Sequence, residues 1–178
     1  MGCHVIGIAG TDDKCKWLTN DLGFDGALNY KKYNNDKRKL QKDLRKLFPN
    51  GIDIYFDNTG GFITESVWNL LNYKGRVILC GQIANYNRLT NVPKIDDFLY
   101  KLIYQHIRVE GFSIHSFKNY SKFYKDMTKW SNEGKIKFRK TVRCGLDAVP
   151  SAFIGLFKGE NTGKMLVKIS DPILKSKL

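Results

Sequence analysis

The chain has 178 residues, of which 42% are hydrophobic and 13% aromatic, and it carries a net charge of +13. This apolar content supports a folded core and excludes wholesale disorder, and the length fits one domain with at most an appended piece. No stretch approaches the roughly 18 consecutive apolar residues of a membrane helix, and no basic region followed by a long apolar run opens the chain. We therefore expect neither a membrane span nor a secretory signal.

The first elements along the chain are a strand, a helix and a second strand. Residues 3–10 (CHVIGIAG) are an almost purely apolar run that ends in glycine, which is typical of a buried parallel strand. Thr11 can cap the following helix, which we expect to run to about Asp21 with acidic residues in its first turn. Residues 27–30 (ALNY) form the next short strand.

A lysine-rich segment follows at residues 31–46. Leu40, Leu44, Leu47 and Phe48 recur in and beside it at helical spacing, which predicts an amphipathic helix with a solvated basic face. A basic surface also attracts nucleic acid, an anionic membrane or a phosphorylated cofactor. No aromatic-studded recognition motif accompanies the charge, but a basic α/β module that binds nucleic acid is kept as an alternative.

The rest of the chain alternates between strands and helices. We expect helices at 64–71, 98–105, 119–133 and 150–159, and strands at 52–61 (running into a glycine turn), 75–81, 108–114, 138–145 and 165–169. An Asn-rich loop at 82–96 contains Pro93. This alternation predicts an α/β fold with a doubly wound, mostly parallel sheet.

Three of the predicted strands end in glycine, at residues 10–11, 57–61 and 80–82. Ligands of such sheets bind outside the carboxyl ends of the strands, where glycine permits close backbone approach. Glycine can also simply end a strand, but its recurrence favours a nucleotide crevice. The chain has no G-x-G-x-x-G motif, which would sit on a strand and helix before residue 1.

Two residues near the first of these turns favour NADP over NAD. In an NAD site, an acidic residue at the end of the second strand accepts hydrogen bonds from the ribose. Here Asp12 and Asp13 lie one turn into the helix, with Lys14 beside them. Lys14 and Tyr30 can converge on a ribose phosphate, the lysine as a point charge and the phenol as a donor.

The four cysteines of the chain do not form a metal-binding pattern. They lie far apart, none at C-x-x-C spacing, and no histidine lies at zinc-finger spacing. We therefore expect no structural zinc, and reduced thiols in a cytoplasmic protein.

Together these residues resemble the zinc-independent branch of the medium-chain dehydrogenase/reductase family, and within it the leukotriene/prostaglandin reductases, also called alkenal double-bond reductases. The likeness covers essentially the whole chain and rests on GIAGTDDKC, LGFDGALNYKK, GIDIYFDNTGG, ILCGQIANYN, VEGFSI, EGKIKFRKTV and AFIGLFKGENTGKMLVKI. It implies a Rossmann-like, doubly wound parallel sheet without its first strand and glycine loop, where the pyrophosphate would sit on backbone N–H groups. Residues 1–136 would be a partial Rossmann nucleotide-binding domain, and 137–178 a C-terminal strand-helix-strand that returns to a catalytic domain absent from the chain.

The resemblance also implies an activity, the NADPH-dependent conjugate reduction of an α,β-unsaturated ketone or aldehyde such as a 15-oxoprostaglandin-type enone, without a metal. Tyr86 is the implied catalytic residue, because the enolate oxygen formed in the reaction needs a neutral hydrogen-bond donor. Lys14 and Tyr30 would hold the 2′-phosphate. The implied cofactor-binding residues are Lys14, Tyr30, Asn58, Cys80, Gly81, Gln82, Ile83, Ala84, Asn85, Tyr86, Phe112, Ser113, Ile114 and Asn161.

On this resemblance the chain is the C-terminal half of a reductase. We expect it to bind NADPH weakly and to turn over little or no enone by itself. Its partners would be a small-molecule enone and a second copy in a homodimer, with no membrane and no nucleic acid. An inactive fragment that pairs with a full-length subunit is a further alternative.

Overall fold

The computed structural model describes residues 2–87 and 97–171, and it divides into two compact units, Met1–Tyr124 and Lys125–Leu178. The predicted boundary between a nucleotide-binding domain and a returning segment, at residues 136 and 137, stays a prediction. Pro93 and most of the predicted loop at 82–96 lie outside the described residues.

The first unit begins with two parallel strands joined by a helix. The elements are β1 (Ile6–Ala9), α1 (Asp12–Lys16), a π-helical turn η1 (Trp17–Asp21) and β2 (Gly26–Asn29). The predicted cap is confirmed, because the Thr11 side chain accepts a hydrogen bond from the Lys14 N–H at 3.2 Å. A Cβ on Gly7 would lie 2.5 Å from the Leu18 Cδ1, so a side chain at residue 7 would force Leu18 to move where η1 packs on β1.

The basic segment is not one continuous helix. It starts as a 3-10 turn, η2 (Tyr30–Tyr33), and the helix proper, α2, spans Lys37–Leu47. Asn34 and Asn35 have left-handed backbone conformations, with φ of 48° and 61°, and these interrupt the helical path. Asp36 then caps α2 by accepting hydrogen bonds from two backbone N–H groups.

The next helix begins earlier than predicted. The strand β3 (Ile52–Asp57) leads into α3 (Gly61–Trp68), and β4 (Leu71–Leu79) follows. The predicted 64–71 helix is therefore displaced by three residues, because the carboxylate of Asp57 accepts the N–H groups of Thr59 and Gly60 and so starts the helix at once. β4 in turn begins at Leu71, opposite Ile52.

The remaining elements of the first unit are η3 (Ile83–Asn85), α4 (Phe98–Tyr104), β5 (Arg108–Gly111), η4 (Ile114–Ser116) and α5 (Ser121–Asn132), within which the unit boundary falls. The predicted strand at 108–114 thus ends at Gly111. All strand pairs are parallel, as predicted.

The strands of the first unit form two hydrogen-bonded sheets, β1–β2 and β3–β4–β5. Within residues 2–87 and 97–171, no strand pairs with the second edge of β1 or of β3. In the Rossmann strand order 3-2-1-4-5-6, the first strand belongs between these two edges. The two sheets are thus separated at the position of the first Rossmann strand, which the sequence predicts to be lacking.

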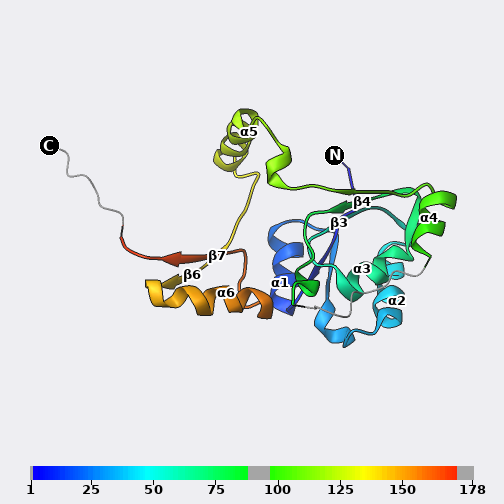
Figure 1. Cartoon of the computed structure of the whole chain (residues 1–178), viewed down its shortest axis with the longest axis horizontal. Helices are drawn as coiled ribbons and strands as arrows, with labels where there is room; N and C mark the ends of the chain where they lie inside the picture. Colours follow the sequence, from blue (N-terminus) through cyan, green and yellow to red (C-terminus); the bar gives the residue numbers. More distant parts are fainter. Residues whose placement is uncertain (1, 88–96, 172–178) are drawn as a thin grey trace. The chain divides into compact units, whose positions relative to one another are not determined.

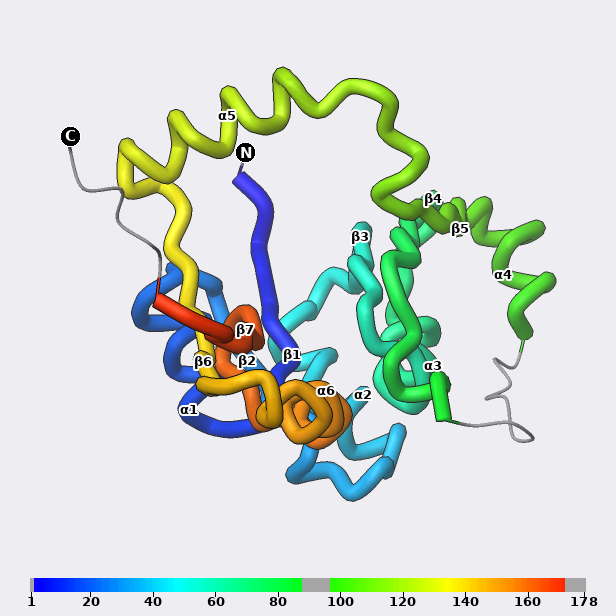
Figure 2. The backbone as a smooth tube through the Cα atoms, turned by 60° about the vertical axis from the view of Figure 1, so that its left-hand side comes forward, coloured from blue at the N-terminus to red at the C-terminus, as the bar shows by residue number. Residues whose placement is uncertain are grey.

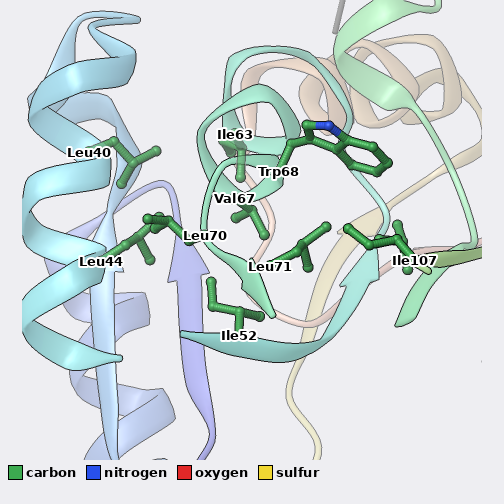
Figure 3. Close-up of a cluster of buried hydrophobic side chains, with 10 residues drawn as sticks. Leu40, Leu44, Ile52, Ile63, Val67, Trp68, Leu70, Leu71 and Ile107 are labelled. Atoms are coloured by element: carbon green, nitrogen blue, oxygen red, sulfur yellow. The ribbon is translucent and has the colours of Figure 1, made fainter. Parts of the chain in front are cut away.

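The core of the first unit lies between α2, α3 and the β3–β4–β5 sheet. Figure 1 shows α2 and α3 side by side next to β3 and β4, and Figure 3 shows that α2 directs Leu40 and Leu44 toward residues of α3 and the sheet. Trp68 stacks on Phe98 with ring centroids 5.0 Å apart, which attaches α4 to the same core. The buried cluster comprises Leu40, Leu44, Ile52, Ile63, Val67, Trp68, Leu70, Leu71, Val77 and Ile107.

The second unit is a parallel strand-helix-strand. It contains β6 (Lys140–Cys144), η5 (Leu146–Ala148), α6 (Val149–Lys158) and β7 (Lys164–Lys168). Figure 2 shows β6 and β7 alongside each other with α6 next to them. This matches the predicted order of strand, helix and strand. β6 lies one or two residues inside the predicted 138–145, and β7 is shifted by one residue toward the N-terminus of the predicted 165–169.

None of the helices in the described part of the chain is both long and apolar enough to span a membrane.

Candidate functional site

The turn after β3 is built around one buried carboxylate. Asp57 is fully buried, and its Oδ1 accepts hydrogen bonds from the backbone N–H groups of Thr59 at 2.8 Å and Gly60 at 2.9 Å. Its Oδ2 accepts the hydroxyl of Thr64 on α3 at 2.6 Å. The hydroxyl of Tyr55 contacts Thr64 in turn, and burial together with the nearby Asp57 charge raises the pKa of Tyr55. The turn at residues 58–61 is therefore held rigidly.

The loop after β4 is bonded to this turn. The N–H groups of Cys80 and Gly81 donate to the Asp57 carbonyl at 2.8 and 3.1 Å, and the Ala84 N–H donates to the Thr59 carbonyl at 2.9 Å. A Cβ on Gly81 would lie 3.2 Å from the Asn58 carbonyl oxygen, so a side chain at this position would press the two loops apart by a few tenths of an ångström. The structure thus brings together Asn58 and the predicted residues 80–86.

Two side chains of this loop matter for its chemistry. The hydroxyl of Tyr86 accepts a hydrogen bond from the Gln82 N–H at 3.3 Å, while the Tyr86 side chain is 61% exposed. The Asn85 Nδ2 donates to the Gln82 Oε1 at 2.8 Å, whereas the Asn85 Oδ1 is buried with no hydrogen-bond partner in the described part of the chain. Buried polar atoms are normally hydrogen-bonded, so this oxygen indicates a place where a ligand donor fits.

The segment after β5 adjoins the same sheet edge. The Phe112 N–H donates to the Leu79 carbonyl at 3.1 Å, and the Phe112 ring lies 6.1 Å from that of Phe56. The carbonyl of Ser113 accepts the Ser116 N–H, and that of Ile114 accepts the Tyr120 hydroxyl at 2.5 Å. Residues 112–114 are therefore a fixed backbone segment.

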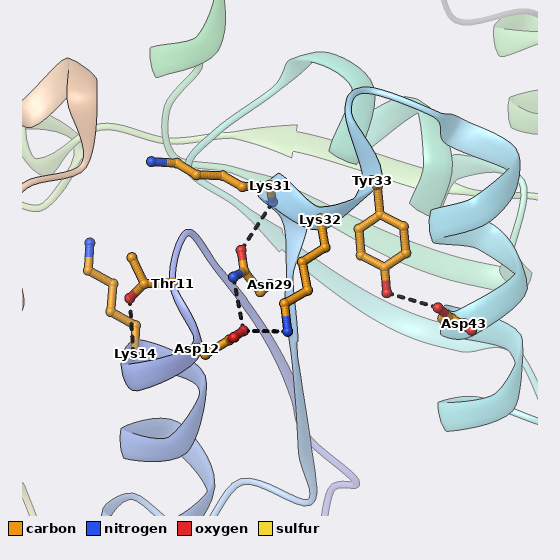
Figure 4. Close-up of polar contacts among 8 residues, drawn as sticks. All are labelled: Thr11, Asp12, Lys14, Asn29, Lys31, Lys32, Tyr33 and Asp43. Atoms are coloured by element: carbon orange, nitrogen blue, oxygen red, sulfur yellow. Dashed lines mark hydrogen bonds and ion pairs between the residues drawn. The ribbon is translucent and has the colours of Figure 1, made fainter.

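The turn after β1 faces the residues that follow β2 (Figure 4). The carboxylate of Asp12 accepts a hydrogen bond from the Asn29 Nδ2 at 3.0 Å and pairs with the Lys32 Nζ at 2.8 Å. These contacts hold the pKa of Asp12 below its usual range. Tyr30 packs beside Gly10, where a Cβ would lie 3.2 Å from the Tyr30 Cε1. The Asp12 carboxylate is thus bound by one lysine and one asparagine of this chain.

Asn161 belongs to the second unit, where its Nδ2 donates to the Gly163 carbonyl at 2.6 Å. Sequence reasoning did not single out Asp57 and Thr64 as site residues. The signal for Asp57 was present, because an aspartate at a strand end followed by two further residues and glycine is typical of a side chain that caps a turn. Among residues 2–87 and 97–171, no group of three or more His, Cys, Asp or Glu side chains is arranged to hold a metal ion.

Comparison with known proteins shows to which family this fold belongs. Residues 1–132 match the family model described as zinc-binding dehydrogenase. The chain belongs to the medium-chain dehydrogenase/reductase family. Its similar sequences put it in the zinc-independent, prostaglandin reductase-like branch, and the Rossmann-like fold expected from the sequence is confirmed.

The sequence relatives of this family member include two with informative names. The NADP-dependent oxidoreductase YfmJ of Bacillus subtilis is 40% identical over 176 residues, which is 96% of this chain and 50% of YfmJ. Prostaglandin reductase 1 of Bos taurus is 38% identical over 174 residues, 94% of this chain and 50% of the relative. The chain therefore spans about half the length of these relatives.

Solved structures of other proteins have a similar fold. CurA of Vibrio vulnificus, in complex with NADPH, superimposes with a TM-score of 0.85 at 39% identity, covering 96% of this chain and 51% of CurA. Mycobacterial Rv1454c complexed with NADPH has a TM-score of 0.76 at 21% identity, covering 94% of this chain and 49% of that one, and shows likeness of fold alone.

Proposed function

We propose that this chain is the nucleotide-binding part of an NADPH-dependent reductase that saturates the carbon–carbon double bond of α,β-unsaturated ketones and aldehydes of the 15-oxoprostaglandin type. The observation that carries the proposal is the bonded pair of loops after β3 and β4, on which Tyr86 is largely exposed. The names of the relatives, an NADP-dependent oxidoreductase and a prostaglandin reductase, support the same reaction class.

The residues present fit a dinucleotide. Side chains are absent where the backbone must lie close to a ligand or a neighbouring loop, since a Cβ on Gly60 would lie 2.9 Å from the Gln82 Oε1. The buried Asn85 Oδ1, which has no hydrogen-bond partner among the described residues, offers an acceptor in the same loop pair. Asn58, residues 80–86 and residues 112–114 would hold the nicotinamide half, Lys14 and Tyr30 the 2′-phosphate, and Asn161 a further part of the cofactor.

Asp12 supports NADPH rather than NADH. A ribose 2′-hydroxyl is usually recognised by an unengaged carboxylate near this strand end. Here Lys32 and Asn29 occupy the Asp12 carboxylate. Its charge is thereby compensated, which removes repulsion against a 2′-phosphate nearby.

Tyr86 would supply the hydrogen bond that the reaction needs. When bound, NADPH would supply a hydride for the β-carbon of the enone, and a proton from water would complete the reduction at the α-carbon. The enolate oxygen that develops requires a donor that is polar but neutral. Because the Tyr86 oxygen accepts the Gln82 N–H, its own proton remains available to the substrate oxygen, and the accepted bond polarises the hydroxyl toward donation.

The separation of the β1–β2 sheet from the β3–β4–β5 sheet predicts a low activity for this chain. The edges of β1 and β3 that have no partner strand in the described part of the chain border the position at which a glycine loop would bind the pyrophosphate. We therefore expect the chain alone to bind NADPH weakly and to reduce enones slowly.

Four cysteines, all free of disulfide bonds, support a cytoplasmic location.

The test is binding of NADPH and NADH to the purified chain by calorimetry, followed by an assay of enone reduction. We expect NADPH to bind more tightly than NADH, and product to form only slowly. Equal affinity for the two dinucleotides would contradict the cofactor assignment. Rapid oxidation of NADPH with an enone would contradict the expected impairment.

A further inference from the structure

The three residues after β2 are fixed by one asparagine. The Asn29 Oδ1 accepts the Lys31 N–H at 3.1 Å and so caps η2, while the Asn29 Nδ2 donates to Asp12 at 3.0 Å. A single side chain thereby sets the backbone of η2 and the position of the Asp12 carboxylate. The consecutive residues Lys31 and Lys32 start from a defined backbone.

These two lysines take opposite directions. The Lys32 Nζ pairs with Asp12 at 2.8 Å. The Lys31 side chain instead passes beside Gly10, where a Cβ would lie 3.4 Å from the Lys31 Cε and also 3.4 Å from the Tyr30 hydroxyl. Figure 4 shows Lys31 and Lys14 extending to the side of the turn away from the Lys32–Asp12 pair.

The charges of Lys14 and Lys31 act on each other. Partial burial lowers the pKa of Lys14, and repulsion by the Lys31 ammonium lowers it further. Two cations that repel across a glycine turn, with a phenol hydroxyl beside them, are a typical setting for a doubly charged oxyanion. A phosphate monoester carries a charge of about −1.5 to −2 near pH 7 and accepts several charge-assisted hydrogen bonds.

We propose that Lys31 is a specificity-determining residue that binds the cofactor's 2′-phosphate together with Lys14 and Tyr30. This inference rests on the proposed function and adds to it a second cation that selects NADPH. Gly10 is part of the arrangement, because the Tyr30 ring and the Lys31 stem both lie against it. Lys32 acts differently: it compensates Asp12, so that the carboxylate does not oppose the phosphate.

The test is calorimetric binding of two probes to the full chain, adenosine 2′,5′-bisphosphate and adenosine 5′-monophosphate. Lys31→Met is expected to weaken binding of the bisphosphate about tenfold, the loss of one charge-assisted contact, and to leave the monophosphate unaffected. Lys31→Arg should keep most of the affinity. Lys42→Met is the matched control, since Lys42 is also exposed and basic but lies on α2 beside Tyr33 and Asp43.

The outcomes separate the two proposals. If the parent chain does not prefer the bisphosphate over the monophosphate, the proposed function fails and the role of Lys31 fails with it. If the parent prefers the bisphosphate but Lys31→Met binds it as Lys42→Met does, the role of Lys31 alone is overturned. Because Lys31 is exposed, the variant should fold, and circular dichroism checks that it does.

Discussion

At the scale of single residues, Asp57 organises the site without facing a ligand. Its carboxylate is fully buried and accepts hydrogen bonds from two backbone N–H groups and from the Thr64 hydroxyl. Without these acceptors the donors would be buried and unpaired, which is costly. The position of the turn at 58–61, and through it the loop at 80–86, therefore depends on this one side chain.

Replacing Asp57 tests this dependence. Asp57→Ala should lower the free energy of unfolding by about 3 kcal/mol, since it leaves three donors unsatisfied. Asp57→Asn should cost less, about 1 kcal/mol, because it keeps an acceptor for the backbone N–H groups. Denaturant titration measures both.

The control lies on the same strand. Asp53 is exposed and accepts one hydrogen bond from Asn72. Asp53→Ala should change the free energy of unfolding by no more than about 0.5 kcal/mol. Equal losses for the two alanine variants would show that the Asp57 network does not stabilise the fold.

Tyr86 allows a prediction about chemistry. Tyr86→Phe removes the hydroxyl that accepts the Gln82 N–H but keeps the ring. We expect the residual rate of enone reduction to fall about 100-fold, the typical loss when one donor to an oxyanion is removed, and the affinity for NADPH to change much less than the rate. Product detection by mass spectrometry measures the rate. A variant that retains the parent rate would exclude Tyr86 as the donor.

At this scale the sequence predicted the glycine turns and the neighbouring loops, because their residue types are restricted by backbone geometry. It did not reveal that Asp57 is the shared acceptor. Nor did it distinguish Lys31 from Lys32, since their opposite directions follow from how Asn29 and Asp12 meet in three dimensions.

At the scale of elements, α2 depends on its cap. Asp36 accepts hydrogen bonds from the N–H groups of Lys39 and Arg38, and these contacts lower its pKa from 3.8. A carboxyl group with a lowered pKa in the folded state stabilises the fold above pH 3.8, and this contribution is lost as the pH falls through the lowered value. Asparagine caps helices without titrating.

The expected result is a difference in pH dependence. Asp36→Asn should show a smaller loss of unfolding free energy than the parent chain when the pH falls below the ordinary value of 3.8. Asp36→Ala should loosen α2 at every pH, with weaker helical circular dichroism. Parallel pH profiles for the parent and the Asn variant would contradict a role for the ionised cap.

The second unit has a matched pair of glycines. Gly163 and Gly145 both have positive φ, of 71° and 90°. A Cβ on Gly163 would overlap the backbone carbonyl of Arg139, whereas one on Gly145 would meet nothing within 4 Å. The two positions thus separate backbone conformation from steric overlap.

Alanine at each position gives the comparison. Gly145→Ala should cost about 2 kcal/mol, because its positive φ with extended ψ is a conformation that residues other than glycine rarely adopt. Gly163→Ala should cost about 3 kcal/mol, because overlap with the Arg139 carbonyl adds to the same strain. Hydrogen exchange of the β6 and β7 amides reports the local loss. Equal effects would mean that Arg139 moves away without cost.

Element types were predictable from apolar periodicity, but several boundaries were not. The start of α2 depends on the left-handed Asn34 and Asn35, and the start of α3 on the Asp57 side chain. Neither conformation leaves a periodic signal in the sequence. The start of β4 at Leu71 follows from pairing with Ile52, a contact between distant residues.

At the scale of the whole molecule, the basic charge has more than one role. Several lysines of the 31–46 segment pair with acids, among them Lys37 with Glu65 and Lys46 with Asp43. These contacts favour the solvated basic face over the nucleic-acid alternative, which the similar proteins described above do not support. The charge that remains favours an anionic cofactor and makes its binding sensitive to salt.

The divided sheet predicts uneven stability within the first unit. β4 pairs on both sides, with β3 and β5, and places Leu71 and Val77 in the core. Among the described strands β1 pairs with β2 alone, and within β1 Gly7 is the one buried residue. A strand with one partner and little buried apolar surface opens at lower free energy than a central strand.

Hydrogen exchange of the full chain measures this difference. Amides of Val77 and Ile78 in β4 should exchange roughly 100-fold more slowly than those of Gly7 and Ile8 in β1, since β1 opens without global unfolding. Denaturant should accelerate exchange in β4 more steeply than in β1, because only the opening of β4 exposes the core. Equal protection of both strands would mean that the two sheets unfold as one cooperative unit despite the absence of hydrogen bonds between β1 and β3 among the described residues.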